Sequence, residues 1–480
     1  MKPRYYIQTF GCQMNVHDSE RMAGMLEDLG YEATPEVAAA DVLLMNTCAV
    51  RERPEHKLYS ELGELRKLKR DNPNMVIGVA GCMAQREADG IRRRVPEVDI
   101  LLGPRNLHHL PHLLRETRRR QYNNEYSTAN QGAFRDGAFS DGLDLECDPT
   151  PVTPVRRSST IAAYVDVIFG CNFNCTYCAV PSARGREVSR RPHDVLDEVR
   201  QLRDLGYREI TLLGQTVNAY GHDLEERRGD GKRYDFAWLL EQINELDSSL
   251  RVRYTSPHPM YFNERLIETI AATPSVCEHL HMPLQSGDNE CLRRMQRTYT
   301  IEKYRRIVER VRQRVPNVAI TTDLIVGFCG ETEDEFQNTL KAVREIEFDQ
   351  AFMFAYSPRH TTQAWDWPDD VPAPVKQRRL RELIDLQNEV GRELNRRRCG
   401  ETVEVLVEGP SDKDASRLSG RTRANKLVVF PGEIDRYPVG SMVEVATREA
   451  FLWGFLGEAV RPVTPVHTEP ARIFIDLVPA

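Results

Sequence analysis

Three cysteines lie close together in the run Cys171-Asn-Phe-Asn-Cys175-Thr-Tyr-Cys178. Thiolates at this spacing can bind one metal centre within a single loop. A cubane 4Fe-4S cluster normally takes four cysteine ligands, so three ligands leave one iron open to a substrate. A structural zinc site would need a fourth protein ligand. The run therefore predicts an open 4Fe-4S cluster, with a zinc site or unligated thiols as the alternatives.

A second set of cysteines is spread through the N-terminal part of the chain. Cys12, Cys48 and Cys82 each follow a short apolar run that predicts a β-strand. Taken singly, each is typical of a buried core thiol. In a parallel sheet, however, the loops after the strands' carboxyl ends meet at one edge, where ligands bind. Their shared position predicts a second three-thiolate metal site. The other thiols interpreted as binding no metal are Cys147, Cys277, Cys291 and Cys399.

The elements around these cysteines predict an α/β protein. Residues 1–120 alternate between apolar runs and helix-periodic segments, which indicates a parallel sheet. The four predicted strands are 5–10, 42–45, 76–80 and 98–102. Residues 121–157, rich in Asn, Ser, Gly, Asp and Pro, are predicted to be a linker.

Residues 158–396 predict six further βα units, which suggest an open, partial (β/α)6 barrel with its substrate loops at the strands' carboxyl ends. The predicted strands are 164–169, 210–213, 252–255, 279–282, 320–326 and 351–356. Residues 397–462 change to short strands with Gly- and Pro-containing turns, which is typical of a small all-β barrel. The tail, 463–480, matches no pattern.

Composition limits the classes of protein. The chain has 480 residues, 40% of them hydrophobic and 29% charged, which fits about three globular domains. It has no run of ~18 apolar residues and no apolar signal-peptide core, so we expect a cytoplasmic protein without a membrane partner. Its net charge of -7 argues against coating nucleic acid through overall charge, although local basic clusters could contact phosphates.

The two cysteine triads, in this domain order, closely resemble the methylthiotransferase family of radical S-adenosylmethionine (SAM) enzymes over residues 4–461. Four motifs resemble the branch that modifies tRNA already carrying an isopentenyl group. They are FGCQMN at 10–15, NTCAVRE at 46–52, AGCMAQ at 80–85 and LSGRTRANK at 418–426.

This resemblance implies insertion of a methylthio group at C2 of N6-isopentenyladenosine in the tRNA anticodon loop, with two SAM molecules consumed per product. A 4Fe-4S cluster on Cys171, Cys175 and Cys178 would cleave SAM to a 5′-deoxyadenosyl radical. A second 4Fe-4S cluster on the N-terminal triad would carry the sulfur. The expected partners are a sulfur donor and a low-potential electron donor such as flavodoxin or ferredoxin, and the protein is expected to be a monomer.

The resemblance also implies binding residues. The C-terminal barrel resembles a TRAM (OB-like) RNA-binding domain, with Arg421, Arg423 and Lys426 as candidate phosphate contacts. Candidates for SAM binding lie within the cysteine run or follow the predicted barrel strands: Tyr177, Gly214, Gln215, Ser256, Gln285, Ser286 and Gly327. His258, after the third barrel strand, is a further candidate. Arg186 and Arg191, after the cysteine run, are candidates for a carboxylate or phosphate contact. The sequence departs from the family pattern at Cys329, where Pro is usual, and at His360-Thr361-Thr362.

Other functions remain open from sequence alone. The sister branches of the family act on threonylcarbamoyl-adenosine in tRNA or on an aspartate of a ribosomal protein. An iron-sulfur RNA-binding sensor without turnover is an alternative from a different class, and SAM cleavage by the reduced protein would separate it from the enzymes.

Overall fold

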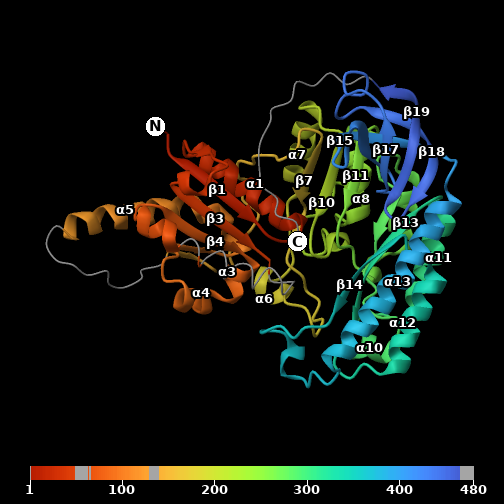
Figure 1. Ribbon diagram of the computed structural model, residues 1–480, viewed down its shortest axis with the longest axis horizontal. Helices are drawn as coiled ribbons and strands as arrows, with labels where there is room; N and C mark the ends of the chain where they lie inside the picture. Colours follow the sequence, from red (N-terminus) through yellow and green to blue (C-terminus); the bar gives the residue numbers. More distant parts are fainter. Residues whose placement is uncertain (1, 49–62, 64–65, 129–139, 465–480) are drawn as a thin grey trace.

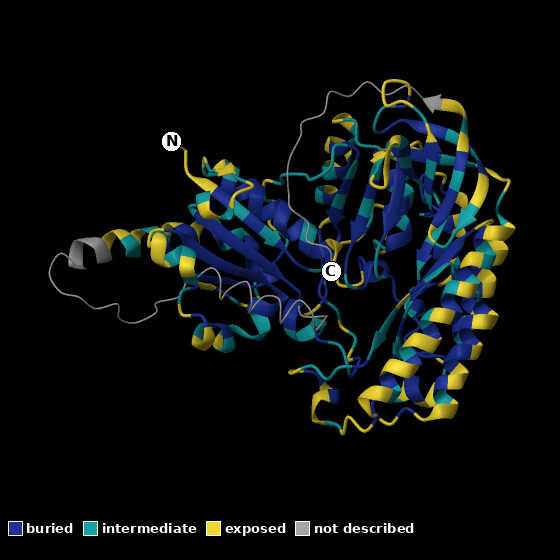
Figure 2. Ribbon diagram, in the orientation of Figure 1, coloured by how far each residue is buried: buried dark blue, intermediate teal, exposed yellow. Residues whose placement is uncertain are grey.

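The structure is a computed structural model that describes residues 2–48, 63, 66–128 and 140–464. Figure 1 shows an N-terminal sheet domain, a central barrel-like domain and a C-terminal β-barrel that follow one another along the chain. In Figure 2 the strands of all three are largely buried, and the outer faces of the helices are exposed. None of the helices within the described residues is long and apolar enough to cross a membrane.

The N-terminal domain is one parallel sheet of six strands in the order β2-β1-β3-β4-β5-β6. Every residue of β3 and β4 is buried, as their nearly continuous apolar sequences predict for a sheet covered on both faces. The strands are β1 (Arg4–Thr9), β2 (Glu32–Ala33), β3 (Val42–Thr47), β4 (Val76–Gly81), β5 (Ile100–Leu102) and β6 (Ser140–Gly142). The sequence prediction of a parallel sheet here is confirmed.

Helices cover this sheet, and two elements lie inside the segment predicted as linker. The last helix, α5 (Leu110–Thr128), continues past residue 120, and β6 pairs with β5. The sheet therefore takes in part of the predicted linker, while residues 129–139 lie outside the described residues. The other helices are α1 (Gln13–Asp28), η1 (Val37–Ala39), α3 (Cys82–Arg86), α4 (Ala88–Arg94) and η2 (Pro104–His109).

The central domain contains the six predicted parallel strands, arranged as two groups of three, β11-β10-β7 and β12-β13-β14. A parallel bridge pairs Val252 of β11 with Val276, three residues before β12, so the two groups adjoin and curve into a partial barrel. The strands are β7 (Ala162–Asp166), β10 (Glu209–Leu213), β11 (Arg251–Tyr254), β12 (His279–His281), β13 (Ala319–Val326) and β14 (Gln350–Ala355). A short hairpin, β8 (Ile168–Phe169) with β9 (Val188–Ser189), follows β7.

Local sequence signals place the helices of this domain. Helix α12 (Glu333–Ile346) begins with a capping box in which Thr332 and Glu335 satisfy each other's backbone N–H groups. Helix α11 (Ile301–Arg314) begins at the Thr300 cap and buries an apolar stripe at helical spacing. The others are α6 (Val180–Arg184), α7 (Pro192–Asp204), η3 (Val217–Ala219), α8 (Phe236–Leu246), η4 (Pro259–Tyr261), α9 (Glu264–Ala272), α10 (Asn289–Arg294), η5 (Gln363–Asp366) and α13 (Ala373–Arg397).

The C-terminal domain is a closed five-stranded barrel in the order β15-β16-β17-β19-β18, which confirms the predicted all-β barrel. Its core is a cluster of buried apolar side chains that includes Val405, Val428 and Phe430. The strands are β15 (Thr402–Ser411), β16 (Asp414–Thr422), β17 (Leu427–Pro431), β18 (Met442–Phe451) and β19 (Gly454–Thr464). The end of the predicted tail, 465–480, lies outside the described residues.

Candidate active site

The first cysteine triad lies in the loop between β8 and β9, directly after the first barrel strand. Gly170 opens this loop with φ +76°, and a Cβ there would lie 2.0 Å from the carbonyl oxygen of Arg186. Only glycine fits such a close approach in a left-handed conformation. The N–H of Cys178 donates to the carbonyl of Cys175 at 3.0 Å, which closes a tight turn. The sequence prediction that one loop presents all three thiols agrees with this placement.

Each thiol of this triad faces a polar group. The Cys171 Sγ lies 3.2 Å from the Thr216 hydroxyl, and the Arg297 guanidinium donates to the Cys175 Sγ at 3.3 Å. Burial raises the pKa of Cys178 to about 12, opposed by a hydrogen bond from the Val180 N–H. A thiolate in such a buried site needs nearby positive charge, which cluster iron would supply. The donor set therefore fits a 4Fe-4S cluster, and the ligand assignment stays a prediction.

Arg297 was not predicted from the sequence, and its replacement tests the site. In Arg297→Gln we expect SAM cleavage by the reconstituted protein to fall about 10- to 100-fold, because the cation beside Cys175 is lost. The cluster's reduction potential should become more negative, since a nearby positive charge favours the reduced state. A redox titration followed by electron paramagnetic resonance measures the potential. The control is Arg293→Gln, which removes an exposed arginine that pairs with Glu290; equal potentials in the two variants would contradict this role.

The second triad gathers at the carboxyl ends of three adjacent strands. Cys12 is the N-cap of α1 after β1, Cys48 follows β3, and Cys82 begins α3 after β4. A Cβ on Gly11 would lie 2.6 Å from the Cys48 Cβ, so glycine at 11 allows the close approach. Cys12 is exposed, and the other two are buried. The structure brings these three residues together as the topology argument predicted, while their binding of a cluster stays a prediction.

Electrostatics at this triad favour a thiolate. The pKa of Cys12 is lowered to about 6, first by its hydrogen bond with Cys48, then by the Arg184 charge and the N–H groups of Asn15 and Met14 at the start of α1. Burial raises the pKa of Cys82, and the same arginine opposes this shift. A donor set with a stabilised thiolate and a nearby cation fits a second cluster.

A buried amide network fixes the strand ends that carry this triad. The Asn15 side chain donates to the Asn46 Oδ1 at 3.1 Å and to the Thr47 carbonyl at 3.2 Å. Asn46 in turn donates to the Asn15 carbonyl at 2.7 Å and to the Ser19 hydroxyl at 3.0 Å. Because all four residues are buried, each polar group needs such a partner. The network sets the spacing between the loops after β1 and β3.

Arg184 connects the two triads. It is the last residue of α6, the five-residue helix that starts two residues after Cys178, and its Nη2 lies 2.7 Å from the Asp18 Oδ2 in α1. Both side chains are almost completely buried. The charge of the same guanidinium acts to lower the pKa of both Cys12 and Cys82. Figure 1 shows α6 next to α3 at the junction of the two domains. One short helix therefore positions both cysteine sites relative to each other.

The SAM candidates lie where predicted, after the carboxyl ends of the barrel strands. Gln215, next to Gly214 after β10, accepts a hydrogen bond from the Gly170 N–H through its side-chain oxygen, so it holds the cysteine loop. Ser256 and Gln285 have left-handed backbones, with φ of 55° and 75°. Non-glycine residues in this region are uncommon and gather at functional sites. SAM contacts by these residues stay predictions.

The remaining candidates lie at the same end of the central barrel, which we call the barrel rim. Gly327 donates from its N–H to the Glu331 Oε2 at 2.5 Å, and Ser286 is buried beside Thr339, with 3.3 Å between their hydroxyls. Tyr177 packs edge-on against Phe328, with ring centroids 6.3 Å apart. Of the further candidates, His258 stacks on Phe173, with their ring centroids 3.8 Å apart, whereas Arg186 and Arg191 are exposed.

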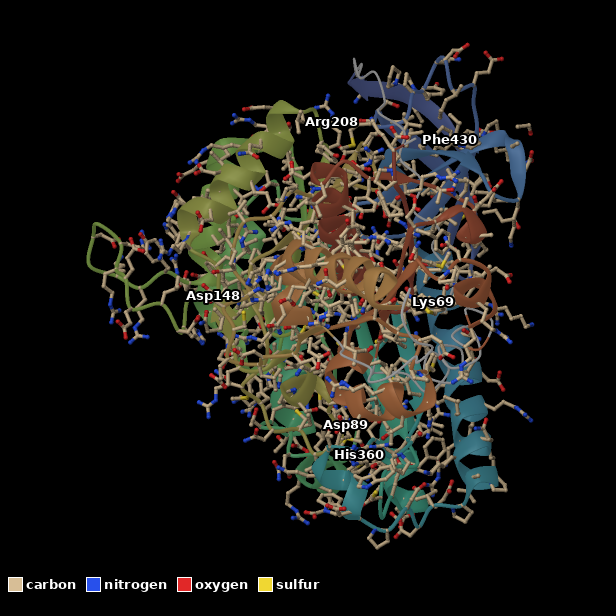
Figure 3. The ribbon with its side chains drawn as sticks, turned by 90° about the vertical axis from the view of Figure 1, so that its left-hand side faces the viewer. Lys69, Asp89, Asp148, Arg208, His360 and Phe430 are labelled. Carbon is tan, nitrogen blue, oxygen red and sulfur yellow. The ribbon has the colours of Figure 1, made fainter. Side chains whose placement is uncertain are left out.

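The two departures from the family pattern have structural roles. Cys329 is buried in a small apolar cluster with Phe328 and Tyr356. Arg86 of α3 donates to the His360 carbonyl and to the Thr361 hydroxyl, the latter at 3.1 Å. The His360 Nδ1 lies 3.9 Å from the Glu87 Oε1, just before α4, and Figure 3 labels His360 and Asp89 of that helix. This loop therefore contacts the N-terminal domain.

The three candidate RNA contacts differ in their surroundings. Arg423 makes a bidentate pair with Glu278, and Lys426 lies 2.8 Å from Asp349 with both side chains nearly buried. Both therefore dock the C-terminal barrel on the central domain. Arg421, with its side chain 43% exposed, pairs with Glu408 of the same C-terminal domain. RNA contact stays a prediction for all three, and Arg421 is the most accessible.

A substitution at Arg423 tests the docking role. In Arg423→Gln we expect proteolytic cleavage between α13 and β15 to accelerate about tenfold, because the ion pair and two hydrogen bonds to the Pro274 and Val276 carbonyls are lost. Arg417→Gln is the control, since Arg417 pairs with Asp414 within the barrel. Equal cleavage rates in the two variants would show that Arg423 does not hold the domains together.

Comparisons with known proteins agree with this architecture. Family models match residues 4–103 (uncharacterized protein family UPF0004), 165–343 (radical SAM superfamily) and 396–450 (TRAM domain). A solved structure of the radical SAM methyltransferase TsrM from Kitasatospora setae, with cobalamin and a 4Fe-4S cluster bound, has a TM-score of 0.53 at 15% identity. It covers 76% of this chain and 77% of TsrM. This likeness shows the fold alone.

Two proteins with known names are much more similar to this chain in sequence than TsrM is. A protein from Carboxydothermus hydrogenoformans named tRNA-2-methylthio-N(6)-dimethylallyladenosine synthase is 45% identical over 458 residues, which cover 95% of this chain and 99% of the relative. A protein of the same name from Halalkalibacterium halodurans is 44% identical over 459 residues, covering 95% and 81%. The chain therefore belongs to the family of tRNA-2-methylthio-N(6)-dimethylallyladenosine synthases within the radical SAM superfamily.

Proposed function

We propose that this radical SAM methylthiotransferase inserts a methylthio group at C2 of N6-isopentenyladenosine in the anticodon loop of tRNA. The observation that carries the proposal is the pair of three-thiol sites, one at each side of Arg184. Family membership at 45% identity over nearly the whole chain supports the same substrate. The proposal includes two 4Fe-4S clusters, their cysteine ligands and the partners of the protein.

The hydrogen at C2 of adenine sets the chemical problem. A side-chain base cannot usefully remove it, because the resulting carbanion has too little stabilisation. A 4Fe-4S cluster with an open iron supplies one electron to cleave SAM and thereby makes hydrogen-atom abstraction available. Cys171, Cys175 and Cys178 would hold that cluster, and Arg297 and Thr216 would orient two of its ligands.

The barrel rim would position SAM against the first triad. Gln215 ties the β10 loop to the cysteine loop, so the two move together. The left-handed backbones of Ser256 and Gln285 turn the chain sharply after β11 and β12. In parallel α/β proteins, substrates bind at this end of the strands. These side chains would orient SAM and exclude water from the site.

The N-terminal triad would hold a second cluster with one iron open to an external sulfur atom. Its thiols come from three separate strands and share Arg184 with the helix that follows the first triad. This shared arginine would fix the position of one cysteine site relative to the other. A second SAM molecule would supply the methyl group, and a sulfur donor and a low-potential electron donor would act on the protein.

The RNA must deliver an unstacked base. A stacked adenine cannot reach either triad, so the nucleotide would leave the anticodon loop's stack and enter between the domains. The TRAM domain would contact the RNA backbone, with Arg421 as its most accessible candidate. The protein is expected to act as a monomer, which light scattering of the tRNA complex would check.

The substrate assignment is tested by nucleoside mass spectrometry. Protein with reconstituted clusters is incubated anaerobically with SAM, sulfide and a strong reductant. Three substrates are compared: tRNA with isopentenyladenosine, the same tRNA with unmodified adenosine, and tRNA with threonylcarbamoyl-adenosine. We expect the methylthio product on the first alone. Product on the third substrate and none on the first would reassign the chain to a sister activity.

A further inference from the structure

A cluster of metal-binding side chains lies away from both cysteine triads. His108 and His109 end the 3-10 helix η2, and Cys147 lies in the segment after β6. The Cys147 Sγ is 3.7 Å from the His108 Nε2 and 3.5 Å from the His109 Nε2. One ligand atom from each of the three residues lies within 4.8 Å of the others. All three residues are half-buried.

These distances fit a single tetrahedral ion. Zinc binds imidazole nitrogen at about 2.0–2.1 Å and thiolate sulfur at about 2.3 Å, which places nitrogen and sulfur about 3.6 Å apart across a tetrahedral site. The two nitrogen–sulfur distances here are 3.7 and 3.5 Å. The thiols of the two triads would bind different irons of a cubane, so they need not approach one another as closely. Mixed imidazole and thiolate ligands favour zinc among the common divalent ions.

The segment that carries Cys147 is held in place by other contacts. Arg105 of η2 donates from Nε to the Cys147 carbonyl at 2.9 Å. Its neighbour Asn106 donates to the Asp144 carbonyl at 2.9 Å, and Gln85 donates to the Leu143 carbonyl at 2.7 Å. Protein contacts thus bring the thiol to the two imidazoles, which makes the site preorganised.

Two acidic residues near Cys147 accept hydrogen bonds from backbone N–H groups. Asp144 accepts from the Glu146 N–H at 2.8 Å, and Asp148 accepts from the Thr150 N–H at 2.9 Å. Figure 3 shows Asp148 at the surface of the molecule. Among the described residues, no fourth His, Cys, Asp or Glu places a ligand atom within 4.8 Å of these three, so water would take the fourth position of a tetrahedral ion.

We propose that His108, His109 and Cys147 bind one zinc ion that fixes the segment after β6 to helix η2. The sequence alone grouped Cys147 with thiols that bind no metal, and the structure revises that interpretation. The ion would also stabilise the region around Arg184, between the two cysteine triads. Arg105, which precedes His108 in η2, donates to the carbonyls of Arg184 and Arg186 at 3.1 and 2.9 Å. With three protein ligands and an open fourth position, the site differs from a closed structural zinc site. It needs no role in the reaction itself.

The test uses the full chain with both clusters reconstituted, so that the cluster thiols are occupied by iron. After incubation with zinc and gel filtration, elemental analysis should give about one zinc per chain. X-ray absorption at the zinc edge, to which iron does not contribute, should show two nitrogen ligands and one sulfur at the distances expected for zinc. A shell of sulfur alone, or less than about 0.1 zinc per chain, would overturn the proposal.

Matched variants locate the ion. Cys147→Ser should weaken zinc binding at least about a hundredfold and keep the iron content of the parent. Cys399→Ser, which changes another half-buried thiol, should keep both metals. His109→Gln provides a second, independent loss of a ligand. Full zinc binding in both Cys147→Ser and His109→Gln would show that the ion lies elsewhere and would refute the site.

Discussion

Cys48→Ala is expected to abolish the methylthio product while SAM cleavage continues at roughly a tenth or more of the parent rate. Cys48 belongs to the N-terminal triad, and the loop that would cleave SAM does not contain it. Losing this thiol should empty the second cluster site and leave the first one intact. The measurement is 5′-deoxyadenosine and methylthio product from the same anaerobic reaction.

Cys175→Ala is the matched comparison, and it should lose both activities. Product and 5′-deoxyadenosine should each fall by about a thousandfold or more, because the cluster that cleaves SAM loses a ligand. Cys277→Ala, a buried thiol in neither triad, should keep both activities. Complete loss of SAM cleavage in Cys48→Ala, with iron still bound at the first triad, would contradict the division of labour between the two sites.

The second large effect concerns stability. Arg184→Gln should destabilise the N-terminal domain by about 3–5 kcal/mol, because it leaves the Asp18 carboxylate buried without its cation. Hydrogen exchange measures this loss locally. The amides of β1 and β3 should exchange roughly a hundredfold faster or more. The same substitution should lower iron occupancy at the N-terminal triad, because the arginine charge favours the thiolate forms of Cys12 and Cys82.

Two controls define that effect. Arg156→Gln removes a partly exposed pair between the segment before β7 and Glu27 of α1, and it should cost less than about 1 kcal/mol. The double variant Asp18→Asn with Arg184→Gln should recover part of the loss, because no unpaired buried charge remains. If Arg184→Gln exchanges no faster than Arg156→Gln, the helix α6 does not link the two sites as described.

Much of the fold follows from local sequence. The predicted apolar run 42–45 lies within the fully buried strand β3, and the predicted barrel strands all appear. The grouping of the N-terminal triad could also be predicted, because the topology of a parallel sheet alone brings the strand ends to one edge. In the C-terminal barrel the sequence predicts strands at 403–407, 426–430, 442–446 and 453–459, but it does not predict β16. This strand carries mostly polar residues and buries Leu418, Gly420 and Thr422, a pattern with one large apolar side chain.

The supports of the site were not predictable in the same way. Arg184 pairs with Asp18 across 166 residues, and Arg297 meets Cys175 across 122. Neither arginine lies in a motif or beside a strand end, so local pattern gives no signal for a tertiary ion pair. Strand β6 reads Ser-Asp-Gly and joins the sheet through backbone pairing with β5. Polar segments of this kind look like linker until the sheet beside them is known.

The central claim is that this chain removes the C2 hydrogen of a tRNA adenine and replaces it with a methylthio group. The measurement is isotope transfer from isopentenylated tRNA deuterated at C2, incubated anaerobically with reconstituted protein, SAM, sulfide and reductant. The account predicts one deuterium in 5′-deoxyadenosine together with the 2-methylthio nucleoside. Cleavage of SAM without deuterium transfer and without methylthio product, in protein with both clusters intact, would contradict it.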